Sequence, residues 1–102
     1  MKFIVRYDCG RLDSDELRFI EAKDYEAAEE WAHGDEFTEY KNSWEWTAYR
    51  EYSDECNDND DSDEKFYKSE TYKDFLSNCT YSVTLANEDE LEFYNDVEWE
   101  EI

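Results

Sequence analysis

Hydrophobic and polar side chains alternate most regularly near the end of the chain. Between residues 79 and 86, Cys79, Tyr81, Val83 and Leu85 alternate with small polar residues and alanine. This period of two is typical of a half-buried strand. After a turn at 87–89, a second alternation over 91–101 predicts another strand that completes a terminal hairpin. One face of that strand would be apolar, and the other would carry a row of carboxylates from Glu92, Asp96, Glu98 and Glu100.

The same terminal segment also allows a helix. Asn87 and Glu90 have the spacing of a capping box, and acidic residues in a first turn favour a helix dipole. Leu91, Tyr94 and Val97 would then line a short apolar stripe. The alternation continues over most of 91–101, so the strand is the preferred interpretation.

The rest of the chain predicts an α+β order. Strands at 2–8 and 16–22 form a hairpin with a long loop. A helix at 25–33 begins after Asp24 as N-cap and ends before Gly34. Residues 35–43 fit either a helical turn or a packed loop, 44–52 alternate like a strand, and 64–78 have helical spacing. The prediction is one domain over 1–102: a mostly antiparallel sheet of about five strands with two helices packed on one face.

Charge changes the picture more than any motif. The chain has 31 Asp and Glu against 10 Lys and Arg, a net charge of −21, although 39% of its residues are hydrophobic. Residues 51–64 and 87–102 each hold eight acids and no base, whereas 1–23 and 65–86 are nearly neutral. Such a charge disfavours direct contact with nucleic acid or anionic membranes and favours a basic partner. The clustering argues against a uniform halophilic coat.

The sequence has few signs of a metal-binding or catalytic site. The acidic loop predicted at 53–63 resembles a calcium loop only in composition: counted from Asp58, Asp63 replaces the required glycine and Ser69 the final glutamate. Three scattered cysteines and one histidine have no zinc spacing, and no catalytic motif is present. We therefore expect no enzyme activity, cofactor or metal. With no apolar run of membrane length, we expect a cytoplasmic protein.

The acidic blocks are the candidate interaction surface. Two tyrosines, Tyr49 and Tyr94, fall on the acidic faces of the predicted strands, and tyrosine is enriched at interface centres. The candidate partner-binding residues are Tyr49, Asp54, Glu55, Asp58, Asp60, Asp61, Asp63, Glu64, Glu88, Asp89, Glu90, Glu92, Tyr94, Asp96, Glu98, Glu100 and Glu101.

In size, acidity and aromatic content the chain resembles small DNA-mimic inhibitors of bacteriophages and mobile elements, of the anti-CRISPR and anti-restriction type. The blocks 54–64 and 88–101 carry this resemblance, and the tetrapeptide Phe93-Tyr94-Asn95-Asp96 resembles the end of a Cas9-inhibiting anti-CRISPR. The resemblance implies an inhibitor, acting in a bacterial host, whose carboxylates occupy the nucleic-acid groove of a nuclease complex. A non-inhibitory acidic adaptor for a basic partner and a calcium-responsive module are the alternatives, and a homodimer is compatible with the tyrosine-rich faces.

Overall fold

The chain begins with the predicted hairpin. The structure, a computed structural model, describes residues 1–55 and 63–102. Strands β1 (Lys2–Asp8) and β2 (Glu16–Glu21) pair antiparallel, with Phe3 opposite Ile20. In the connecting loop the Asp8 carboxylate accepts hydrogen bonds from the Gly10 N–H (2.8 Å) and the Ser14 hydroxyl (3.1 Å). The loop is therefore fixed by local side-chain bonds to its own backbone.

Two further strands complete a four-stranded sheet with the order β3-β1-β2-β4. Strand β3 (Thr80–Leu85) pairs antiparallel with β1, as the alternation in 79–86 predicts. Strand β4 (Glu100–Glu101) is only two residues long and pairs parallel with β2. The α+β class is confirmed, but the sheet is mixed and has four strands because two of the five predicted strands are largely helical or irregular.

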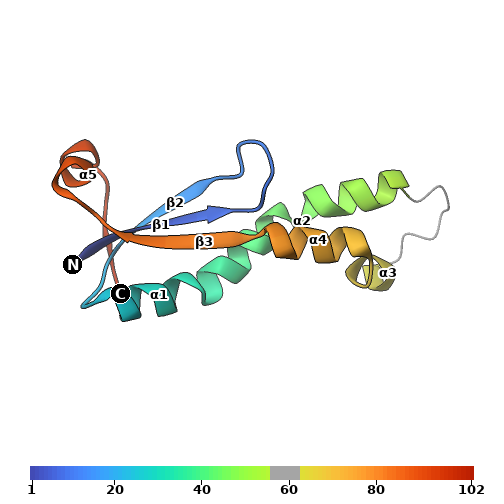
Figure 1. The fold of residues 1–102 in the computed structure, drawn as a ribbon, viewed down its shortest axis with the longest axis horizontal. Helices are drawn as coiled ribbons and strands as arrows, with labels where there is room; N and C mark the ends of the chain where they lie inside the picture. The colour runs from blue at the N-terminus through green and yellow to red at the C-terminus, as the bar shows by residue number, and fades with distance from the viewer. Residues whose placement is uncertain (56–62) are drawn as a thin grey trace.

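Helices α1 (Tyr25–Ala32) and α2 (Asp35–Glu55) cover one face of the sheet (Figure 1). The prediction for 25–33 is confirmed: the Asp24 side chain accepts the Ala27 N–H at 2.8 Å and begins the helix. Tyr7 anchors this layer, because its hydroxyl donates to the Ala32 carbonyl at 2.6 Å and its ring stacks on Tyr40 at 5.2 Å.

The strand predicted at 44–52 is wrong, since these residues continue α2. Tyr40, Ala48 and Tyr52 are buried at intervals that are multiples of four residues, which is helical spacing, whereas Trp46 is 57% exposed. The alternation of Trp44, Trp46 and Ala48 resembled a strand locally. Packing along the longer helical stripe outweighed it.

Beyond the sheet, the second half of α2 packs against α4 (Glu70–Asn78) and α3 (Asp63–Tyr67). The helix predicted over 64–78 is interrupted at Ser69, whose hydroxyl oxygen accepts the Tyr72 N–H at 3.2 Å and caps α4. The molecule is consequently elongated, with extents of 54 × 23 × 18 Å (Figure 1). The sheet occupies one end and the α2–α4 layer the other.

The prediction of a terminal hairpin is also wrong. Helix α5 (Glu88–Phe93) takes the place of the predicted turn and of the start of the second strand. Residues 94–99 form turns and irregular chain, and only Glu100–Glu101 form a strand. The capping box is complete: the Asn87 side-chain oxygen accepts the Glu90 N–H at 2.8 Å, and the Glu90 carboxylate accepts the Asn87 N–H at 3.1 Å. Tyr94 and Trp99 then fold over Phe19, at ring distances of 4.8 and 5.3 Å, on the sheet face opposite the α1–α2 layer. Of the side chains on the predicted apolar face, Trp99 is covered in this way, whereas Phe93 is 77% exposed.

Candidate acidic interaction surface

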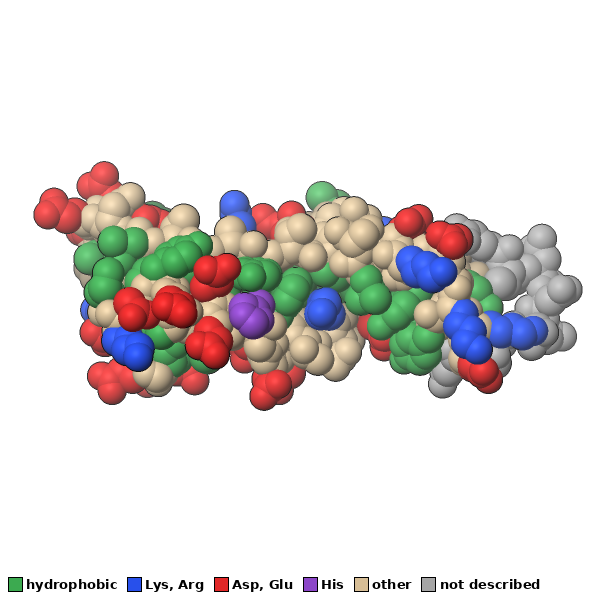
Figure 2. All heavy atoms as spheres, turned by 60° about the horizontal axis from the view of Figure 1, so that its bottom comes forward, with side chains coloured by type: hydrophobic (Ala, Val, Ile, Leu, Met, Phe, Trp, Pro, Cys, Tyr) green, Lys and Arg blue, Asp and Glu red, His purple; other side chains and the backbone are tan. Residues whose placement is uncertain are grey.

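Helix α5 and the C-terminal segment, which hold one acidic block, lie at the sheet end of the molecule, and the chain ends beside α1 (Figure 1). Figure 2 shows carboxylates concentrated at the α1 end of the face it presents, with several Lys and Arg side chains at the opposite end. We call this surface the acidic cap and define it by its carboxylates: Glu26, Glu29 and Glu30 of α1; Glu88, Asp89, Glu90 and Glu92 of α5; and Asp96, Glu98, Glu100 and Glu101.

The acidic cap keeps its charge, because the positive side chains that form salt bridges form them elsewhere. Within residues 1–55 and 63–102, the salt bridges join Arg6 to Asp15, Arg11 to Glu51, Arg18 to Glu16 and Glu36, Lys68 to Glu64, and Lys73 to Glu70. None of them includes a carboxylate of the cap. Most cap carboxylates are also exposed, so they are available to a partner.

The cap rests on a fixed support. Besides the capping box of α5, the Lys2 ammonium lies 5.3 Å from the centre of the Trp99 ring, and the Ile102 N–H donates to the Glu21 carbonyl at 3.1 Å. These contacts tie the C-terminal segment to both sheet strands at its base. A partner would therefore meet carboxylates on an ordered backbone, which lowers the entropy cost of binding.

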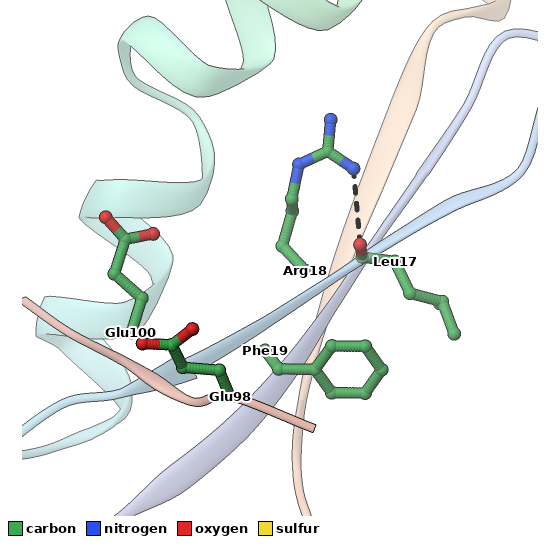
Figure 3. Close-up of a pocket in the computed structure, with 5 residues that line it drawn as sticks. All are labelled: Leu17, Arg18, Phe19, Glu98 and Glu100. Atoms are coloured by element: carbon green, nitrogen blue, oxygen red, sulfur yellow. Dashed lines mark hydrogen bonds between the residues drawn. The ribbon is translucent and has the colours of Figure 1, made fainter. Parts of the chain in front are cut away.

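An open hollow of about 430 Å³ lies between β2 and the C-terminal segment, lined by Leu17, Arg18, Phe19, Glu98 and Glu100 (Figure 3). The Arg18 guanidinium is already engaged, donating to Glu36 at 2.7 Å, to Glu16 at 3.0 Å and to the Leu17 carbonyl at 3.2 Å. Burial opposes the charge of Arg18, but the hydrogen bonds to the two carboxylates raise its pKa above the usual value.

Glu98 and Glu100 thus face the hollow without a basic partner among the described residues. The ring of Phe19 and the side chain of Leu17 give the hollow an apolar wall. An incoming lysine or arginine could lay its aliphatic stem on that wall and direct its charged end to the carboxylates. The hollow therefore suits a basic side chain from another protein.

The described residues of the second predicted acidic block lie at the other end of the long axis (Figure 1). The predicted loop at 53–63 is wrong at its start, because Asp54 is an exposed residue of α2 and Glu55 ends that helix. Asp63 begins α3, and Glu64 pairs with Lys68 at 3.0 Å. Asp58, Asp60 and Asp61 lie outside the described residues. The two blocks therefore do not form one continuous surface.

The two tyrosines predicted for acidic strand faces have other positions. Tyr49 lies on α2, half-buried, with its ring 5.2 Å from that of Phe66. Tyr94 is half-buried against Phe19. Both belong to aromatic clusters because the strands that would have exposed them are a helix and a helix end.

Sequence reasoning missed the contribution of α1. Glu26, Glu29 and Glu30 were visible as the polar face of the helix predicted at 25–33. Nothing in the sequence showed that this face lies beside the end of the chain. In the structure Glu30 and Ile102 line one shallow hollow with Trp31.

Other chemistry has little support in the described part of the chain. No group of three His, Cys, Asp or Glu side chains there is arranged to hold a metal ion. Burial raises the pKa of Cys79 to about 11, so this thiol is protonated and weakly nucleophilic at neutral pH. Among the described helices none combines the length and apolarity needed to cross a membrane. Comparisons with known protein families, with curated proteins and with solved structures give no match.

Proposed function

We propose that this protein is a DNA-mimic inhibitor that occupies the nucleic-acid groove of a bacterial defence nuclease complex, of the CRISPR or restriction type, in the host cytoplasm. The observation that carries the proposal is the acidic cap, whose carboxylates form no salt bridge with the described residues. A groove lined with Lys and Arg would attract this surface as it attracts a phosphate backbone.

Size and charge support the comparison with a duplex. Double-stranded DNA carries one charge per about 1.7 Å of axis, so a duplex as long as this molecule would hold about 32 phosphates. The protein is 54 Å long and has 31 acidic residues with a net charge of −21. Since the cap holds 11 of these acids and lies at one end, the proposed mimicry applies to that end of the molecule rather than to its full length.

Inhibition would be competitive. Cap carboxylates would take the positions of phosphates, release counterions from the groove and exclude the nucleic acid. The hollow beside Glu98 and Glu100 would receive one Lys or Arg side chain of the target and fix the orientation of the complex. Association would be fast at low ionic strength and would weaken steeply as salt is added.

A capture experiment with matched variants tests the proposal. The cap variant carries Glu92→Lys, Glu98→Lys and Glu100→Lys. The control carries Asp35→Lys, Glu39→Lys and Asp74→Lys, which change the net charge equally at exposed positions outside the cap and outside the block 54–64. Each immobilised protein is incubated with bacterial lysate at low salt. Bound proteins are then eluted with a salt gradient and, separately, with duplex DNA.

We expect wild type and control to retain a discrete nucleic-acid-binding protein that duplex DNA releases, and the cap variant to lose it. The captured protein is then assayed for DNA cleavage with and without inhibitor. Equal retention by the cap and control variants would refute a role for the cap. Retention without displacement by DNA would refute inhibition by mimicry and indicate an adaptor.

A further inference from the structure

Strand β3 forms one edge of the sheet and pairs only with β1 (Figure 1). The Ala86 N–H donates to the Lys2 carbonyl at 3.0 Å, which sets the alternation of backbone groups along β3. In an antiparallel pair, every second residue directs its N–H and C=O toward the neighbouring strand. Tyr81, Val83 and Leu85 therefore direct theirs outward, away from β1.

This edge has none of the charges that normally protect a free strand. Residues 75–87 form the longest stretch of the chain without Asp, Glu, Lys or Arg, although 40% of all residues are of these types. The edge also has no proline. Thr80, Ser82 and Thr84 are exposed on one side of the strand, and Leu85 is 55% exposed on the other. An uncharged, accessible edge is a template for pairing with another strand.

We propose that β3 pairs antiparallel with β3 of a second copy of this chain, joining the two four-stranded sheets into one. With the two-fold axis at Val83, Tyr81 lies opposite Leu85 of the second copy, and the outward backbone groups of both strands satisfy each other. Ser82 lies opposite Thr84 of the second copy, so that the side chains facing each other beside the axis are small and uncharged.

The distribution of charge favours this direction of pairing. The acidic α5 follows β3 immediately, whereas α3 and α4, which carry Lys65, Lys68 and Lys73, precede it. Antiparallel pairing brings Glu88 of one copy opposite Asn78 of the other, so each α5 lies beside the end of α4 of its neighbour, in the nearly neutral segment 65–86. Parallel pairing would instead place the two acidic caps together, which their mutual repulsion opposes.

Sedimentation equilibrium of the full chain at rising salt is the first test. Two molecules of charge −21 repel each other overall. Dimerisation should therefore strengthen between about 0.05 M and about 0.5 M NaCl as screening increases. Capture of a basic target through the acidic cap should change in the opposite direction. The proposed dimer and the proposed inhibitor function can therefore be refuted independently of each other.

Two variants locate the interface. Ser82→Lys with Thr84→Lys places lysines opposite each other on both sides of the two-fold axis, and should weaken the dimer by about tenfold or more. The matched control, Thr38→Lys with Asn42→Lys, makes the same change of charge at exposed positions of α2 and should leave the dimer intact. Leu85→Pro removes an outward N–H without removing a bond to β1, and should also weaken the dimer.

Amide hydrogen exchange gives a direct readout. The N–H groups of Tyr81, Val83 and Leu85 should become more protected as protein concentration increases, while circular dichroism of the variants shows an unchanged fold. A monomer at every salt concentration would overturn the proposal. A dimer that the β3 variants and the α2 control weaken equally, or whose formation leaves these three amides unprotected, would overturn it too.

Discussion

Replacing Arg18 by alanine should destabilise the protein far more than replacing Arg6, although each change removes one positive charge. Arg18 connects β2 to α2 through its hydrogen bonds to Glu16 and Glu36 and lies 5.6 Å from the centre of the Tyr7 ring. Its side chain is 28% exposed. Arg6 and Asp15 are 60% and 50% exposed and approach only to 3.4 Å.

The magnitude follows from what the Arg18 variant leaves behind. Two partly buried carboxylates would face each other and the Tyr7 ring without a cation. Hydrogen bonds to charged groups contribute about 1.5–3 kcal/mol each when well shielded. Because Glu16 and Glu36 are about one-third exposed, at 35% and 29%, we discount this sum and expect a loss of about 2–4 kcal/mol. The exposed pair of Arg6 should contribute about 0–1 kcal/mol.

Urea unfolding at neutral pH, followed by tryptophan fluorescence and circular dichroism, measures both losses. The Arg6→Ala variant is the matched control because it raises the net negative charge equally. In the Arg18→Ala background, Glu36→Gln should recover part of the loss, since it removes one of the two unpaired carboxylates. Equal destabilisation by Arg18→Ala and Arg6→Ala would show that overall charge repulsion, rather than the local network, determines the effect.

Three further predictions concern stability. Burial raises the pKa values of Tyr7 and Tyr40 above the usual value of about 10, so both phenols should ionise only as the protein unfolds. The free energy of unfolding should therefore fall as pH rises above about 10. Ultraviolet titration of the nine tyrosines, with and without urea, measures this. Tyr40→Phe removes the 2.8 Å bond to the Ser14 carbonyl and should cost about 1–2 kcal/mol in urea unfolding, against about zero for the exposed Tyr25→Phe. Asn87→Ala breaks the capping box and should destabilise α5 by about 1 kcal/mol, seen as faster amide exchange confined to that helix.

Some elements were predictable because their signals are local and agree with one another. The first hairpin, the helix after Asp24 and strand β3 each combine a clear hydrophobic period with a turn or cap at the boundary. Where two local signals conflicted, the sequence did not decide. Residues 44–52 satisfy a short alternation and a longer helical stripe, and contact of α2 with α4 favours the stripe.

The terminal segment, which carries part of the acidic cap, shows the same conflict between helix and strand signals. The capping box at Asn87 and the alternation of Leu91, Phe93, Val97 and Trp99 predict different structures from the same residues. The helix forms because its first turn is fully capped, and Tyr94 and Trp99 still find an apolar surface on Phe19. That surface belongs to a strand some 80 residues earlier in the chain, at position 19 against 99, so no local pattern could reveal it.

The sequence alone determined the total charge, its clustering in two blocks and the α+β class, because these depend on composition and short-range periodicity. Only the tertiary structure decided which acids remain unneutralised and where they lie. Arg11 forms a salt bridge with Glu51, and Arg18 with Glu36. The partners are far apart in the sequence, and only the fold brings them into contact. Folding also placed the described residues of the two acidic blocks at opposite ends of the long axis and brought the C-terminus beside α1. Ion pairing and proximity depend on distances in space, and for this chain those are fixed by packing around the sheet.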